Sequence, residues 1–502
     1  MADLILAHDL GTTGNKASLF DGNGRLVTSA FSSYTTDYPQ PGWAEQRAAD
    51  WWCAVVSSTR ELLQGADVRP HQIAVVSFSG QMMGCLPVDR EGRPLRSAII
   101  WADQRAEAQA EMLIQRVGWD RVYRLTGHRA SSSYSGAKLA WIRDEQPEIF
   151  GQTTKMLQAK DYVAYRLTHV YATDYSDASG TNLFDLSERR WSQVICEALE
   201  LDSHLLPQAL PSSSVIGEVT DEAARETGLA QGTPVAIGGG DGACATAGAG
   251  VVQPGDAYCY IGSSSWISFV SPDPLYDPEK RTFTFAHLDP DYVFPTGTMQ
   301  CAGGSYDWLE RLLREKGDRE PMHAELDALA SEVAPGAQGL FFLPYLMGER
   351  SPHWNPRARG VFIGLTMAHG RAEMARAVLE GVAFNLRTIL QALTRQGAPV
   401  EALRVIGGGA RSDLWRQILA DVLDRPLLRT ELSVEATALG AAVAGGVAVG
   451  LFDDYDVVRG LVHVAPGERP DPSAAAGYAE LYDVFAETYE ALEPIYNRIA
   501  AL

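Results

Sequence analysis

The same succession of strand, hydroxyl-rich glycine turn and strand occurs twice in this chain, about half of its length apart. The first copy is LAHDLGTTGNKASLF at 6–20, and the second is YCYIGSSSWISF at 258–269. Each copy is followed further on by a buried strand that ends in small residues, IAVVSFSG at 73–80 and ALRVIGGGA at 402–410. A repeat period of half a chain indicates a duplicated domain rather than a solenoid of short repeats.

Helical patterns alternate with these strands, so we expect an α/β fold. A chain of 502 residues is long enough for two domains, and we place them at 1–245 and 246–502, with the boundary near GGGDGACATAGAG at 238–250. Ligands commonly bind between domains. Helical spacing is expected in 43–63, in 412–423 and in the small apolar run 438–452, which is too short and too rich in glycine to span a membrane.

Net charge and composition limit the partners. The net charge of −21 argues against nucleic acid and against an anionic membrane surface. The six cysteines are scattered without zinc spacing, which indicates free, buried thiols in a reducing compartment. The sequence shows no basic segment followed by an apolar segment of the secretory type, so we expect no secretory signal. We therefore expect a cytoplasmic protein with a small-molecule substrate.

The first glycine turn is a candidate phosphate-binding element. It is neither a GxxxxGK[ST] loop nor a GxGxxG loop. Backbone N–H groups and hydroxyls of Gly11, Thr12 and Thr13 can point at a phosphate, Lys16 can add a positive charge, and Asp9 can hold Mg²⁺ at the end of the strand. The alternative is a β-hairpin whose turn happens to be rich in glycine and threonine.

Two longer stretches carry a family resemblance. SYSGAKLAWIRDE at 133–145 and GVFIGLTMAHGRAEMARAVLEG at 360–381 resemble the two signatures of the FGGY carbohydrate kinases. This resemblance covers essentially the whole chain and implies two RNase H-like domains around a deep cleft, with ATP on one side and a sugar at the bottom. We expect Lys138 and Trp141 of the first signature to pack rather than to react.

Within this family, the chain is most similar to the xylulokinases. The supporting stretches are KDYVAYRLTHVYATDYSDASGTNLFDL at 160–186, GERSPHWNP at 348–356 and IGGGARSDLWRQILADVL at 406–423. The resemblance implies phosphorylation of a ketopentose such as D-xylulose. Alternatives are a kinase for another ketose or polyol, such as ribulose or erythritol, and a non-metabolic ATPase or a sugar sensor of the same superfold. Dimers are common among similar proteins, so a homodimer is possible.

The resemblance assigns roles to individual residues. Asp241 matches the catalytic aspartate of the family, and its alternative role is the N-cap of the following helix. A carboxylate near a helix N-terminus is expected to stay ionised, as a base must. The candidate nucleotide-binding residues are Gly262, Ser263, Ser264, Gly408, Gly409, Ala410 and Ser412. The alternative role of the glycine-rich stretch is close packing of helix on strand.

The sugar side has candidates in FSGQMMG at 78–84 and WADQRA at 101–106. Their polar groups can pair with hydroxyls, although Asp103 and Arg105 have the alternative of a local ion pair. Xylulokinases usually read QMHG and GGGDN where this chain has QMMG and GGGDG, so Met83 and Gly242 put the substrate in doubt. The candidate sugar-binding residues are Gln81, Met82, Met83, Trp101, Asp103, Arg105 and Asp241.

Overall fold

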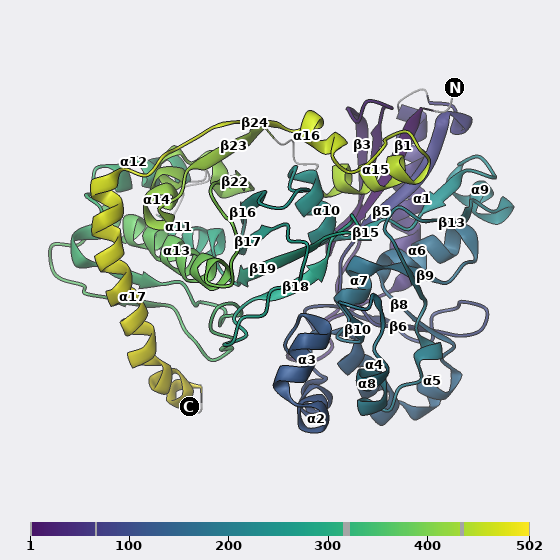
Figure 1. Cartoon of the computed structure of the whole chain (residues 1–502), viewed down its shortest axis with the longest axis horizontal. Coiled ribbons are helices and arrows are strands. Elements are labelled where there is room, and N and C mark those ends of the chain that lie inside the picture. Colours follow the sequence, from purple (N-terminus) through teal and green to yellow (C-terminus); the bar gives the residue numbers. More distant parts are fainter. Residues whose placement is uncertain (1–2, 66–67, 315–321, 432–435, 501–502) are drawn as a thin grey trace.

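Two α/β lobes make up the molecule, one from each half of the chain (Figure 1). The computed structural model describes residues 3–65, 68–314, 322–431 and 436–500. Each lobe is built on a seven-stranded mixed sheet. This arrangement confirms the prediction of a duplicated α/β fold.

The two sheets share one strand order. In the N-terminal sheet, β1 (Leu4–Leu10) runs antiparallel to β2 (Gly14–Phe20) and parallel to β5 (Ile73–Gly80). In the C-terminal sheet, β16 (Ala257–Ile261) runs antiparallel to β17 (Ser265–Phe269) and parallel to β22 (Leu403–Ile406). The other strands are β3 (Leu26–Ser33), β13 (Val215–Glu218), β14 (Pro234–Ala236) and β15 (Gly239–Gly240) in the first sheet, and β18 (Phe283–Ala286), β19 (Val293–Met299), β23 (Leu427–Glu431) and β24 (His463–Pro466) in the second.

Amphipathic helices cover these sheets close to where the sequence pattern predicted them, although the first begins at Ala48 rather than at 43, because Glu45–Gln46 form the short strand β4. Helix α1 (Ala48–Gly65) buries Trp51, Val55 and Leu62 against the first sheet. Helix α14 (Asp413–Leu423) buries Trp415 and Ile418 in the core of the second lobe. That core also holds α13 (Arg371–Thr394) and α17 (Pro472–Ile499), which lies at the outer edge of the second lobe (Figure 1).

The lobes interlock through two helices of small residues. Helix α15 (Ala436–Ala448) follows the second sheet in the chain but packs on β1 and β5 of the first (Figure 1). A Cβ atom at Gly440 would lie 2.1 Å from the Cys244 carbonyl oxygen of α10 (Asp241–Gly248), and one at Gly445 would lie 2.8 Å from Ser77 Cβ. The small run at 438–452 is thus a helix followed by a turn, as predicted, and its glycines allow this close packing.

The cysteine prediction needs one correction. All six cysteines are free, and five are buried, but Cys53 is exposed because it lies on the solvent side of α1. Within the described residues, no helix has the length and apolarity that a membrane span requires.

Candidate active site

In the first glycine turn, backbone carbonyl groups accept hydrogen bonds from side chains, while backbone N–H groups are left open. Gly11 O accepts hydrogen bonds from the Tyr34 hydroxyl at 2.5 Å and from Gln81 Nε2 at 3.3 Å, and Thr12 O accepts one from Gln46 Nε2 at 2.7 Å. The N–H groups of Thr12 and Thr13 have no acceptor in the described part of the chain. A turn with occupied carbonyls and open N–H groups suits an anion.

The second turn repeats this arrangement at the matching place in the second lobe. Gly262 O and Ser263 O accept hydrogen bonds from the first N–H groups of α11 (Gly303–Leu313) at 2.8 and 3.0 Å. The N–H groups of Ser263 and Ser264 find no acceptor among the residues described. A Cβ atom at Gly303 would lie 2.5 Å from Gly262 O, so glycine is required for this contact.

The glycines at 407–409 adjoin the second turn. Gly407 has φ +95°, and a Cβ atom there would lie 2.5 Å from Ile261 O, so Gly407 serves the close approach of two strand ends. Gly408 is different, because a Cβ atom there would meet nothing within 4 Å. Ser412 caps α14 through a hydrogen bond from Trp415 N at 3.1 Å. Nucleotide contact by Gly408, Gly409, Ala410 and Ser412 stays a prediction.

Asp9 and Asp241 lie near each other at the ends of the first sheet. Asp9 pairs with Ser79 of β5, and Ser79 pairs with Gly239 of β15, so two strand spacings, about 10 Å, separate the backbones of Asp9 and Gly239, and Asp241 follows two residues after Gly239. Asp9 Oδ2 accepts a hydrogen bond from Thr437 Oγ1 at 2.6 Å, which connects it to α15. Lys16 lies directly opposite Asp9 on β2.

The environment of Asp241 makes it a weak acid. Burial and the charge of Asp9 raise the pKa of its carboxyl to about 7, although Gly242 N donates to Asp241 Oδ1 at 2.7 Å. Two expectations are therefore corrected. The N-cap of α10 is Gly240, with Asp241 as the first helical residue. The pKa of Asp241 is raised rather than lowered, because desolvation and a second carboxylate outweigh the helix N-terminus.

The glycines before Asp241 pack against protein. Cβ atoms at Gly238, Gly239 and Gly240 would lie 2.0 Å from Phe78 O, 2.2 Å from Leu288 Cδ2 and 2.7 Å from Met82 Cγ. They therefore fix the turn against β5 and the neighbouring side chains.

The structure brings several sugar-side candidates to the first turn. Trp101 Nε1 donates to Thr12 Oγ1 at 3.0 Å, and Gln81 is buried with its amide on Gly11 O and Gln46. Met82 is buried under Gly240, while Met83 is half-buried and has φ 65°. Their contact with a sugar, and a deep cleft to hold it, stay predictions.

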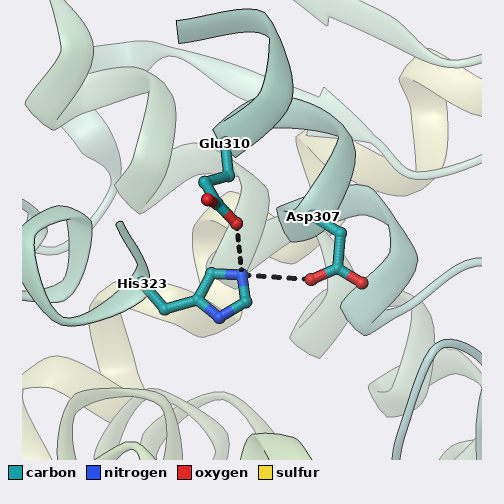
Figure 2. Close-up of side chains that lie close together, drawn as sticks. All are labelled: Asp307, Glu310 and His323. Atoms are coloured by element: carbon teal, nitrogen blue, oxygen red, sulfur yellow. Dashed lines mark ion pairs between the residues drawn. The ribbon is translucent and has the colours of Figure 1, made fainter. Parts of the chain in front are cut away.

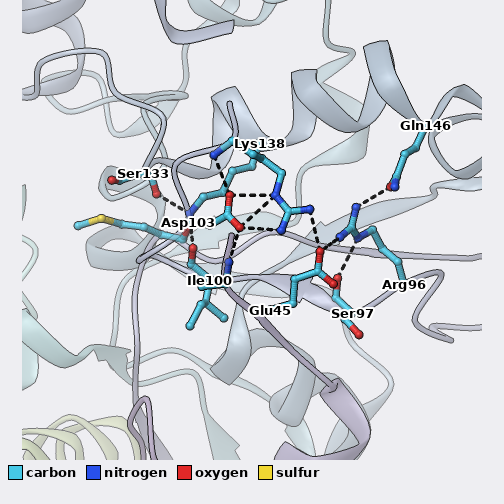
Figure 3. Close-up of polar contacts among 11 residues, drawn as sticks. Glu45, Arg96, Ser97, Ile100, Asp103, Ser133, Lys138 and Gln146 are labelled. Carbon is cyan, nitrogen blue, oxygen red and sulfur yellow. Dashed lines mark hydrogen bonds and ion pairs between the residues drawn. The ribbon is translucent and has the colours of Figure 1, made fainter. Parts of the chain in front are cut away.

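Asp103 and Arg105 form the local ion pair that was their alternative role (Figure 3). Both side chains are buried, and Arg105 also lies 2.7 Å from Glu45 Oε1 and over the ring of Trp43. Asp103 Oδ2 accepts a hydrogen bond from Ala44 N at 2.6 Å. The observed pairing holds the loop together, although Arg105 Nη1 is buried without a hydrogen-bond partner in the described residues. Direct sugar contact by either residue stays a prediction.

Lys138 holds the same region together. Its Nζ donates to the carbonyls of Met83, Ile100 and Ser133 at 2.9, 2.7 and 2.6 Å (Figure 3). Burial lowers the pKa of Lys138 to about 7. The expectation that this signature lysine packs rather than reacts agrees with its three backbone contacts.

Sequence reasoning missed two arginines beside Trp354. The guanidinium groups of Arg129 and Arg350 lie 5.3 and 5.7 Å from the ring centroid of Trp354. Trp354 and Met83 pack against the same apolar cluster, which also contains Met82. Within the described residues, neither guanidinium group forms a salt bridge, although Arg350 N donates to Glu349 Oε1 at 2.8 Å. Because 129 and 350 are far apart in sequence, only the fold reveals this pairing.

A separate group of ligand-type side chains comes from α11, which carries Asp307 and Glu310, and from the start of α12 (His323–Ser331). His323 Nε2 is 3.0 Å from Asp307 Oδ1 and 3.1 Å from Glu310 Oε2 (Figure 2). In the described part of the chain, these are the residues that satisfy a three-ligand metal geometry. His323 is nearly half exposed, and its two ion pairs account for the arrangement.

Comparisons with known proteins agree with this geometry. The profile of the N-terminal domain of the FGGY family of carbohydrate kinases matches residues 4–248, and that of the C-terminal domain matches 257–449. The xylulose kinase of Escherichia coli (strain K12) is 35% identical over 493 residues, covering 98% of this chain and 100% of that protein. The gluconokinase of Bacillus licheniformis is 32% identical over 508 residues, covering 100% and 98%. The crystal structure of xylulose kinase from Rhodospirillum rubrum superposes with a TM-score of 0.91 at 32% identity, covering 98% of this chain and 100% of that chain.

Proposed function

The chain belongs to the FGGY family of carbohydrate kinases, and we propose that it transfers the γ-phosphoryl group of ATP to a sugar hydroxyl, with D-xylulose as the leading acceptor and D-xylulose 5-phosphate as the product. The observation that carries this proposal is Asp241, a half-buried carboxyl with its pKa raised to about 7, which directly follows β15 beside the strand end that carries Asp9. Phosphoryl transfer needs mainly position and charge neutralisation, and these groups can supply both.

Asp241 acts as the general base in this proposal. Its carboxylate takes the proton of the sugar hydroxyl while that oxygen bonds to the γ-phosphorus, and the bond from phosphorus to the β,γ-bridging oxygen breaks to release ADP. A pKa near the working pH balances the fraction ionised against the strength of the base. The raised pKa of Asp241 suits this task.

The turns bind the nucleotide phosphates. Thr12, Thr13, Ser263 and Ser264 present N–H groups and hydroxyls from the two lobes. The open face at Gly408 leaves room for the nucleoside. Such donors stabilise charge where it develops during transfer.

Asp9 fits a magnesium site by its chemistry. It offers a carboxylate at a strand end beside the phosphate turn, and Thr437 orients one of its oxygens. Carboxylates together with substrate phosphates are the usual ligands of Mg²⁺. When bound, Mg²⁺ would neutralise phosphate charge during transfer.

D-Gluconate is a second candidate acceptor. Arg129 and Arg350 lie beside Trp354, and their guanidinium groups form no salt bridge in the described part of the chain. Guanidinium groups pair readily with carboxylates, and the similar gluconokinases support this alternative. A neutral ketose offers no carboxylate to these guanidinium groups.

The test is ADP release with Mg²⁺-ATP across a panel of D-xylulose, other ketoses, polyols and aldonates. We expect strong sugar-dependent release with one acceptor class, and mass spectrometry should find one added phosphoryl group on that sugar. ADP release that no sugar stimulates would refute a sugar kinase and favour an ATPase.

A further inference from the structure

A buried polar chain connects the segment 160–186 to the turn before Asp241. Lys160, on α6 (Ala159–Thr168), places its Nζ 2.8, 2.9 and 3.1 Å from carboxylate oxygens of Asp161, Asp174 and Asp177. Each of these side chains is at most 1% exposed. No step of the proposed reaction uses this cluster, so its place in the fold requires another explanation.

The cluster is a costly way to hold a short segment. Desolvating an ammonium and three carboxylates offsets much of their attraction, and buried ion pairs are weak evidence for stability. Burial raises the pKa of Asp177 well above its usual range. The best-attested use of such groups is to fix a position, and the relevant question is which group this cluster positions.

Asp174 orients the hydroxyl group of Ser176. Asp174 ends β9 (Ala172–Asp174) and caps α7 (Tyr175–Ser179), where its Oδ2 accepts hydrogen bonds from Ser176 N at 2.8 Å and Ser176 Oγ at 2.5 Å. Because the Ser176 hydroxyl proton is committed to Asp174, its oxygen lone pairs are left to accept.

Ser176 Oγ accepts a hydrogen bond from Gly240 N at 2.8 Å. Gly240 is the residue before Asp241 and the N-cap of α10. Lys160 also supports this turn sterically, because its Cβ lies 2.9 Å from the place of a Cβ atom at Gly80, and Gly80 is the β5 partner of Gly240. The cluster thus reaches the turn through a hydrogen bond and through packing.

We propose that Ser176 is a positioning residue for the general base: its hydroxyl, oriented by Asp174 and Lys160, holds the Gly240 N–H and thereby sets where the Asp241 carboxylate points. This inference rests on the proposed role of Asp241. A displacement of about 1 Å at a reacting group costs up to about 10²-fold in rate, so a hydrogen bond one residue away affects turnover without contacting the substrate.

Ser212 provides a matched control. Its Oγ donates to the same Asp174 Oδ2 at 2.8 Å and its side chain is equally buried, but its hydroxyl does not contact Gly240. Ser176→Ala and Ser212→Ala each remove one donor from Asp174. Only Ser176→Ala also removes the acceptor of Gly240 N–H.

The experiment compares kcat, KM for ATP and sugar, and the thermal midpoint of both variants with the wild type. We expect Ser176→Ala to lose about 10- to 100-fold in kcat with both KM values within about threefold, because the lost contact orients the base and not the substrates. Ser212→Ala should keep kcat within about threefold of the wild type. Its thermal midpoint should fall by about as much as that of Ser176→Ala, because both variants remove one donor from Asp174.

Equal kcat values in the two variants would overturn the positioning role, as would a loss in Ser176→Ala that appears only in KM. If Ser176→Ala does not fold, Ser176→Cys and Ser212→Cys give the same comparison, because a thiol is a weak acceptor, and the kcat loss should again be confined to position 176. A wild type that phosphorylates no sugar would refute the proposed function, and the positioning role would fall with it. If the wild type is active and the Ser176 and Ser212 variants have equal kcat values, only the positioning role is refuted.

Discussion

Replacing Asp241 by asparagine tests the chemistry most directly, because the change keeps the shape and removes the base. General-base loss costs about 10²–10⁴-fold in turnover, so we expect kcat to fall by that factor while ATP binding persists. The assay is coupled ADP release at saturating sugar and Mg²⁺-ATP, with nucleotide affinity measured by calorimetry. Turnover within a few-fold of the wild type would show that another group takes the proton.

The pH dependence follows from the raised pKa of Asp241. With the pKa at about 7, roughly one tenth of the carboxyl is ionised at pH 6 and roughly nine tenths at pH 8. The base must be ionised, so kcat/KM of the wild type should rise about tenfold per pH unit below pH 7 and level off above it. Asp241→Asn should lose this inflection, and a variant that retains it would assign the inflection to a different residue.

The same pKa predicts a gain in stability for Asp241→Asn. Between about pH 4 and pH 7 the unfolded chain has released this proton while the folded protein keeps it, so the stability of the wild type falls as pH rises through that window. The full pKa difference corresponds to about 4 kcal/mol, and solvent access to the half-buried carboxyl reduces our expectation to about 1–2 kcal/mol. Thermal midpoints without nucleotide or Mg²⁺ should be higher for the variant at pH 8 and equal at pH 4. A variant that is less stable at pH 8 would refute the assigned cost of burial.

Four further results are expected. Asp9→Ala should lower kcat, with partial rescue by added Mg²⁺ in a titration, and unchanged Mg²⁺ dependence would leave Asp9 as a turn residue. Arg129→Ala should raise KM for D-gluconate at least about tenfold and leave KM for D-xylulose unchanged, since it removes a guanidinium group that can pair with the gluconate carboxylate. Equal effects on both sugars would contradict the second candidate acceptor. Met83→His with Gly242→Asn should sharpen selectivity for D-xylulose in competition assays, because the new side chains can donate hydrogen bonds. Position 242 can accept a side chain, since a Cβ atom there would make only ordinary contacts of 3.7 Å and longer. Reduced selectivity would place the sugar site elsewhere. Small-angle scattering should show a smaller radius of gyration with sugar and a non-hydrolysable nucleotide, whereas an unchanged radius would argue against closure.

The sequence predicted the features that depend on local composition. The two turns, the strands that lead into them and the helix in the small apolar run 438–452 each have a residue pattern with one dominant structural meaning, and the structure contains them. The Asp103–Arg105 pair was foreseen as an alternative because the residues are two positions apart. The interaction that ties Thr437 to Asp9 was not foreseen, because 428 positions separate the residues and a single sequence carries no signal of such a contact.

The error about Asp241 has an instructive cause. Its place at the start of α10 is a local feature, and local reasoning predicted a stabilised carboxylate. The pKa is instead governed by burial and by Asp9, which the order of β1, β5 and β15 brings close. A site that binds a polyphosphate and its metal gains from two neighbouring carboxylates, although they repel each other in the free protein. Mg²⁺ held by Asp9 without nucleotide would relieve that repulsion, so the pKa of Asp241 should fall when Mg²⁺ alone binds. A titration of the nucleotide-free protein should therefore give a lower pKa for Asp241 with saturating Mg²⁺ than without it, and a pKa that is equal or higher would mean that the charge of Asp9 does not set the strength of the base.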